Sequence, residues 1–141
     1  MKDEWSGDNG CGVKYFSQDG IIKLAKAGGV ELNESDFPAQ KLVAVQDLMA
    51  EDDLKASAIF RSMGVYLGHT AALYQYFYGM KNILLMGRAV SGRGGEIILS
   101  VAKKVLAEDY PELNINVALP DEKTRRVGQA VCAASLPKIT G

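Results

Sequence analysis

Two short apolar segments constrain the fold of this chain more than any other feature. Ile83–Met86 is an unbroken apolar run, typical of a strand buried on both faces, and Ile115–Leu119 is a second such run that Pro120 closes. A helical pattern over Glu96–Leu106 separates them, which predicts two parallel strands joined by a right-handed crossover. Because a stable sheet normally needs three or more strands, we expect another part of the protein or a second subunit to complete this one.

Helical patterns account for most of the remaining sequence. In the longest of them, Gly64, Gly68 and Ala72 recur every four residues, and this stripe of small side chains allows another backbone to approach closely. We expect packing under the sheet to offset the helical cost of the glycines, up to about 1 kcal/mol each. The sequence thus predicts an α/β fold, with residues 1–12 as a flexible lead-in and 13–141 as a single domain. The predicted helices are Val13–Ala27, a helix with Pro38 in its first turn that ends at about Ala50, Asp52–Asp53 to about Tyr78, and Glu122–Leu136. Ser35 or Asp36 is the expected cap of the second helix.

Composition and charge exclude several classes of function. The chain has 141 residues, 48% of them hydrophobic and 23% charged, which suits one folded domain. Its net charge of −1 provides no basic face for nucleic acid or membrane, and no apolar run approaches the ~20 residues that a membrane span needs. Cys11 and Cys132 are too few for a disulfide framework, and the start lacks a signal-peptide pattern. We therefore expect a cytoplasmic protein.

The glycine-rich segment Gly87–Gly95 carries the most chemical information. It follows the first predicted strand and precedes a helix, a place where backbone N–H groups can bind an anion or a nucleotide. It is not a P-loop, because Arg93 and Gly94 stand where lysine and a hydroxyl residue are required. The spacing of Gly92, Gly94 and Gly95 does not fit the dinucleotide fingerprint either. Two interpretations stay open: a ligand-free connection, and the adenosine loop of an actin-like kinase.

The residues around this turn resemble the C-terminal region of the ROK family of bacterial sugar kinases and related transcriptional repressors. That region has a helix with a G-x-x-L-G pattern, an apolar strand and a glycine turn. The matching residues here are Gly64, Leu67 and Gly68, then Ile83–Met86, then Gly87. The likeness extends from about residue 9, where Asn9–Gly12 and Tyr15–Ser17 resemble the family's zinc segment and the helix after it, to the closing helix at Arg126–Leu136.

The resemblance implies the C-terminal lobe of the actin-like sugar-kinase fold, and a parent activity of ATP-dependent sugar phosphorylation. Magnesium would be held mainly by the missing half of the protein. Where the family turn usually reads Gly-Gly-Gly, this chain has Gly87-Arg88-Ala89, so either the nucleotide pocket is altered or Arg88 points outward and meets phosphate. The nucleotide contacts carried over are Gly87, Arg88, Ala89 and Ser91, with Glu96 as a weaker candidate.

The same resemblance implies what this chain lacks. The catalytic aspartate and the phosphate-binding hairpins of the family precede this region, so we assign no catalytic residue and expect no activity from this chain alone. Zinc is not expected, because a structural site needs four ligands and only Cys11 is present in the matching segment. The expected partners are a nucleotide, a sugar in the intact protein, and a second copy or a missing N-terminal lobe. The alternative function is a non-catalytic regulator fragment or dimerisation module.

Three other groups of residues have both structural and functional interpretations. His69, the only histidine, is expected to be a buried or half-buried structural residue rather than a ligand contact. The aromatic cluster of Tyr74, Tyr76, Phe77 and Tyr78 is expected in the core or an interface rather than as a nucleic-acid stacking platform. Arg125–Arg126 is expected to be solvated charge, the other interpretation being contact with phosphate or another domain.

Overall fold

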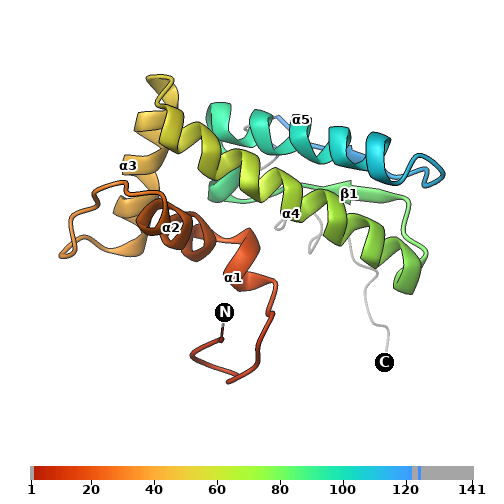
Figure 1. Ribbon diagram of the computed structural model, residues 1–141, viewed down its shortest axis with the longest axis horizontal. Coiled ribbons are helices and arrows are strands. Elements are labelled where there is room, and N and C mark those ends of the chain that lie inside the picture. The colour runs from red at the N-terminus through yellow and green to blue at the C-terminus, as the bar shows by residue number, and fades with distance from the viewer. Residues whose placement is uncertain (1, 122–123, 125–141) are drawn as a thin grey trace, which may run out of the picture.

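The computed structural model describes residues 2–121 and 124, and it has a mixed, mostly helical α/β fold (Figure 1). The expected helix Glu122–Leu136, with Arg125–Arg126 and Cys132, lies outside the described residues, apart from Thr124. In chain order the elements are α1 (Val13–Phe16), α2 (Gln18–Ala27), α3 (Pro38–Ala50), α4 (Leu54–Tyr78), β1 (Asn82–Leu84), the 3-10 helix η1 (Arg88–Val90), α5 (Gly92–Asp109) and β2 (Asn116–Ala118).

The bounds of α3 and α4 agree with the predictions from local signals, except that the N-cap of α3 is Phe37 and not Ser35 or Asp36. Pro38 is the first residue of α3, and the side-chain oxygen of Gln40 accepts a hydrogen bond of 2.9 Å from the backbone N–H of Phe37. Asp53 caps α4, because its carboxylate accepts a bond of 2.8 Å from the N–H of Ala56. The helix ends at Gly79, whose φ of 62° is left-handed.

The N-terminal part of the chain contains more structure than the sequence predicts. The expected helix Val13–Ala27 is interrupted at Ser17, whose hydroxyl accepts a bond of 3.1 Å from the N–H of Asp19 and thereby starts α2. Before α1, residues 2–9 form a hydrogen-bonded turn in which Lys2 and Asn9 make an antiparallel bridge. We call residues 2–9 the N-terminal turn.

Helices α4 and α5 pack side by side along their length and run in the same direction (Figure 1). Gly64 lies beside Val101 and Gly68 beside Val105, and a Cβ atom built on either glycine would lie 2.6 Å from the Cβ of its valine neighbour. The prediction that the small-residue stripe packs under a sheet is therefore wrong, because the backbone that approaches it belongs to a helix. The two helices can come this close because Gly64 and Gly68 have no side chains.

Strands β1 and β2 form a two-stranded parallel sheet, with Asn82, Ile83 and Leu84 opposite Asn116, Val117 and Ala118. The parallel pairing confirms the prediction. The expectation that the first strand is buried on both faces is wrong: Leu84 is 61% exposed, whereas the next residue, Leu85, is buried. Val117 of β2 is also buried, at 1% exposure. The sheet thus buries one face in the core and leaves Leu84 exposed on the other.

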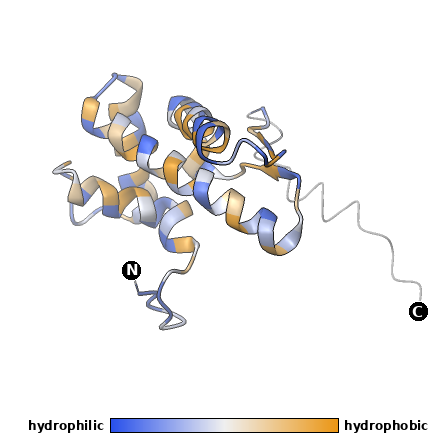
Figure 2. Cartoon of the chain, turned by 45° about the vertical axis from the view of Figure 1, so that its right-hand side comes forward, coloured by the Kyte–Doolittle hydropathy of each residue, from blue (hydrophilic) through white to orange (hydrophobic). Residues whose placement is uncertain are grey.

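The hydrophobic core lies between the helices and the buried face of the sheet. Figure 2 shows that the long helices carry both hydrophobic and hydrophilic residues, as expected for helices with one face toward the core. The core joins all the larger elements. Its largest fully buried side chains come from α2, α3, α4 and β2 (Ile21, Leu42, Val45, Phe60 and Val117), and α5 adds the buried Ile98 and Leu106.

Candidate functional site

The connection from β1 to α5 contains a sharp backbone bend at Gly87. Its φ of 96° and ψ of 174° belong to a region that is essentially restricted to glycine. The single 3-10 turn Arg88–Val90 follows, and the side-chain amide of Gln46 in α3 donates a hydrogen bond of 2.8 Å to the carbonyl oxygen of Arg88. Val90 is buried. The bend is therefore anchored from both sides, by α3 and by the core.

Helix α5 begins at Gly92, four residues before the predicted start at Glu96. The glycines that suggested a longer loop have packing roles inside the first turns of the helix. A Cβ atom on Gly94 would lie 2.5 Å from the ring of Phe60, and one on Gly95 would lie 1.9 Å from the carbonyl oxygen of Val90. Neither position tolerates a side chain in this arrangement, so Gly94 and Gly95 are explained without a ligand.

The structure brings four of the five candidate nucleotide contacts together. Gly87, Arg88, Ala89 and Ser91 all lie in the turn, and the hydroxyl of Ser91 makes no capping bond to the helix. Glu96 is exposed one turn into α5, because the helix starts earlier than predicted.

The two arginines near the turn differ in their partners. Arg93 forms a two-pronged ion pair with Asp52, with nitrogen–oxygen distances of 2.5 and 2.8 Å. Arg88 is exposed, and within the described part of the chain it has no ion pair. Because Arg93 is already neutralised, Arg88 is the cation that remains among the described residues of this turn for an anionic ligand.

An apolar cavity of about 190 Å³ lies directly beside the turn. This volume is below the ~300–1,000 Å³ typical of complete small-molecule sites, so the cavity can hold only part of such a ligand. Its walls come from the end of β1, the turn, and helices α1, α4 and α5: Phe16, Met63, Leu67, Leu84, Leu85, Met86, Val90 and Ile98.

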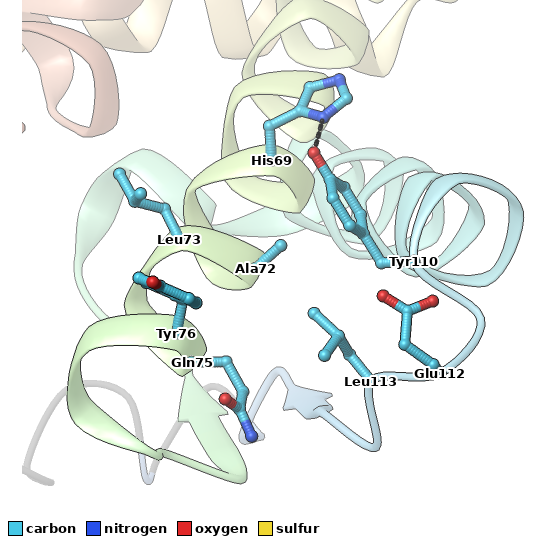
Figure 3. Close-up of a pocket in the computed structure, with 8 residues that line it drawn as sticks. All are labelled: His69, Ala72, Leu73, Gln75, Tyr76, Tyr110, Glu112 and Leu113. Atoms are coloured by element: carbon cyan, nitrogen blue, oxygen red, sulfur yellow. Dashed lines mark hydrogen bonds between the residues drawn. The ribbon is translucent and has the colours of Figure 1, made fainter.

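A second, larger cavity of about 520 Å³ lies beside the C-terminal half of α4 (Figure 3). Its walls come from α4 and from the segment after α5, and they are His69, Ala72, Leu73, Gln75, Tyr76, Tyr110, Glu112 and Leu113. We call this cavity the α4 pocket. Sequence reasoning missed it, because no spacing pattern links residues 69–76 to residues 110–113.

His69 contacts Tyr110 across this pocket, with 3.0 Å between its Nδ1 and the tyrosine hydroxyl oxygen (Figure 3). His69 is not in the core: 48% of its side chain is accessible, which agrees with the half-buried structural histidine expected from the sequence. The aromatic cluster at the end of α4 does not join the core either. All four of its members are exposed, Tyr76 most of all at 83%.

The described residues contain neither a metal-binding cluster nor a membrane-spanning helix. These residues contain no group of three or more histidine, cysteine or acidic side chains that could hold a metal ion. Cys11, partly exposed, is a free cysteine whose sulfur lies 3.8 Å from the carbonyl oxygen of Asp8. No helix in the described part of the chain is long and apolar enough to cross a membrane.

Comparison of the chain with protein-family models, with curated proteins and with solved structures found no match. The resemblance to the ROK family therefore stays a prediction.

Proposed function

We propose that the Gly87 turn is one wall of a nucleotide site and that this chain is the nucleotide-binding lobe of an ATP-dependent sugar-kinase-like protein. The observation that carries the proposal is the bend at Gly87, which lies at the carboxyl end of a parallel strand and leads into the 18-residue helix α5. Open α/β sheets bind ligands at this position. The order α4, β1, turn, α5 and β2 also agrees with the C-terminal lobe of the actin-like fold that the sequence resembles.

Different residues of the turn would contact different parts of the nucleotide. The apolar cavity beside the turn suits a planar base, and the backbone at Gly87 and Ala89 would lie against the nucleoside. Arg88, which has no ion pair in the described chain, would meet phosphate, and the hydroxyl of Ser91 would donate a hydrogen bond. Glu96 would contribute at most from the second turn of α5. Magnesium would be held mainly by residues of the missing half.

The described residues supply one side of the proposed cleft, and this limits the expected nucleotide binding and phosphate transfer. The small volume of the cavity supports a site that another lobe or a second copy completes. Phosphoryl transfer depends on positioning and on charge stabilisation from several sides of the phosphate. This chain alone should therefore bind nucleotide weakly and transfer no phosphate.

A second candidate function is a non-catalytic regulator fragment or assembly module. It is favoured by Arg88 and Ala89, which stand where the family turn carries glycines and so put side chains where a nucleotide would approach. The two functions differ in one measurable property, which is affinity for ATP.

Isothermal titration calorimetry with ATP tests the proposal. We expect binding in the millimolar range, and we expect Arg88→Ala to weaken it by about 3- to 10-fold, the loss of one exposed charge contact. Arg61→Ala is the matched control, because Arg61 is exposed on α4 and its guanidinium bonds only to Ser57 of the same helix among the described residues. Absence of heat at millimolar ATP, or equal loss in both variants, would favour the non-catalytic function.

A further inference from the structure

The α4 pocket lies at the opposite end of α5 from the Gly87 turn. The 18 residues of α5 span about 27 Å at 1.5 Å per residue, so the pocket is separate from the proposed nucleotide site. Its volume of about 520 Å³ falls within the ~300–1,000 Å³ range of sites that hold small groups. It is lined mainly by apolar and aromatic side chains with a few polar groups at its edge (Figure 3).

The electrostatics of this pocket favour a cation. Because α4 and α5 run in the same direction, the C-terminal ends of both helices lie at this end of the molecule, and each carries partial negative charge. The carboxylate of Glu112 lines the pocket, and that of Asp109 lies 4.0 Å from Nε2 of the lining residue His69, so both add negative charge. No lysine or arginine is among the lining residues.

The aromatic rings of the pocket suit the same kind of ligand. Tyr76 and Tyr110 present rings from opposite walls, and a cation above such a ring is attracted by its negative face. The hydrogen bond between His69 and Tyr110 holds the second ring in place. An alkyl chain ending in a guanidinium or ammonium group would place its apolar part against Ala72 and Leu113, and its charge near Glu112.

The surroundings of the pocket indicate that this cation belongs to a protein. Leu73, Tyr74, Phe77 and Tyr78 are exposed next to Tyr76 on the C-terminal half of α4. A group of exposed apolar and aromatic side chains beside an acidic pocket is typical of protein interfaces, where tyrosine and arginine contribute much of the binding energy. A free amine would leave these side chains exposed to water.

We propose that the α4 pocket accepts an arginine or lysine side chain of a protein partner, whose neighbouring apolar residues cover the exposed aromatic face of α4. Glu112 pairs with the incoming charge, and Tyr76 and Tyr110 flank its alkyl stem. The proposal does not depend on nucleotide binding, and either proposal can fail without the other.

Binding in the pocket can be measured through His69, because it is the only histidine of the chain and it lines the pocket. Its ring proton signals are followed by NMR during titration with acetyl-Leu-Arg-Leu-amide, with the same peptide carrying neutral citrulline, and with acetyl-arginine amide. We expect the arginine peptide to shift these signals and to bind about 3- to 10-fold more tightly than the citrulline peptide. It should also bind at least about threefold more tightly than acetyl-arginine amide, since the leucines cover apolar surface.

Substitution of Glu112 tests whether the arginine peptide binds in the α4 pocket. Glu112→Gln should weaken binding of the arginine peptide by about 3- to 10-fold, whereas Glu108→Gln, at an exposed residue that pairs with Lys104 outside the pocket, should not. No shift at millimolar peptide, equal binding of the citrulline peptide, or equal effects of the two variants would overturn the proposal. Equal affinity for acetyl-arginine amide would overturn the assignment to a protein partner and favour a free amine.

Discussion

The helix pair α4–α5 is closely packed along its length, whereas the sheet β1–β2 is short and only partly buried. At the helix pair, Gly64 and Gly68 let two long helices meet closely along their length, and the contact is filled by Val101 and Val105. The sheet has two strands of three residues each, buries Val117, and leaves Leu84 exposed. The helical layer thus satisfies its own packing, whereas the sheet has an exposed second face, which parallel sheets normally cover.

This difference supports the proposal that the turn is one wall of a site that another lobe or a second copy completes. The turn that follows β1 is held firmly, because Gly95 packs against the carbonyl of Val90 and Gln46 bonds to Arg88. The helical layer therefore fixes the position of the turn, while the sheet beside it is short. Two experiments test how far the two layers differ, and a third tests the N-terminal turn outside both.

The largest effect is expected at the helix pair. Gly64→Leu places a side chain where even a Cβ atom would lie 2.6 Å from the Cβ of Val101 and 2.9 Å from the carbonyl oxygen of Ile98. The helices must then separate, and the free energy of unfolding should fall by about 3 kcal/mol, the upper part of the range for overpacking. Urea denaturation measures it.

The matched control is Arg61→Leu, which adds the same side chain to the same helix at an exposed position. Its effect should stay within about 0.5 kcal/mol. Similar results for the two variants would show that the close contact of α4 and α5 does not exist in solution.

An effect of intermediate size is expected in the sheet, where substitutions on the buried and the exposed face should change the free energy of unfolding by different amounts. Val117→Ala removes buried methyl groups from β2 and should lower the free energy of unfolding by about 2 kcal/mol. Leu84→Ala, on the exposed face of β1, should change it by about 0.5 kcal/mol or less. A large loss for Leu84→Ala would mean that this face is covered in solution, and the contrast between the layers would then disappear.

The smallest effect is expected at the N-terminal turn, outside both layers. The buried Lys14 contacts Asp3, Glu4 and Asp19. Hydrogen bonds from the backbone, that of Ser6 above all, lower the pKa of Asp3, and the hydrogen bond from Lys14 lowers the pKa of Glu4. Carboxyls with lowered pKa values stabilise the fold above their unfolded pKa of about 4, and this stabilisation is lost as the pH falls through the lower folded values.

Fluorescence anisotropy of Trp5 measures this loss, because Trp5 is the only tryptophan and its backbone N–H donates a hydrogen bond of 3.0 Å to the carboxylate of Asp3. Anisotropy should fall below about pH 4 while the helical circular dichroism of α4 and α5 persists. Lys14→Met should lower the anisotropy already at pH 7. Lys26→Met, which breaks only the pair with Glu34 and a bond to the same residue, should leave it unchanged.

Local signals in the sequence predicted the helices well and the surfaces poorly. Pro38 and Asp53 fix the starts of α3 and α4 through interactions within one turn of chain, so these bounds could be predicted. The start of α5 could not be predicted. Gly94 and Gly95 leave room for the ring of Phe60 and the carbonyl of Val90, and contacts of this kind do not appear in a linear sequence pattern. The apolar composition of Ile83–Met86 likewise does not reveal that Leu84 is 61% exposed.

The candidate site was predicted in part for the same reason. Gly87, Arg88, Ala89 and Ser91 are adjacent in sequence and are therefore adjacent in space. The ion pair between Asp52 and Arg93, which leaves Arg88 as the available cation, joins residues 41 positions apart. The α4 pocket combines two distant segments, and neither alone has a recognisable motif.

The short sheet has a consequence for handling the protein. Lys81 and Leu85 bond to β2 through their backbone, so the alternation along a strand directs the N–H and C=O groups of Asn82 and Leu84 to the opposite edge. In the described residues no other strand borders that edge. Exposed edges of this kind pair readily with a neighbouring chain, so concentrated solutions should form aggregates through β1, and a charged residue introduced at Leu84 should keep the molecules apart.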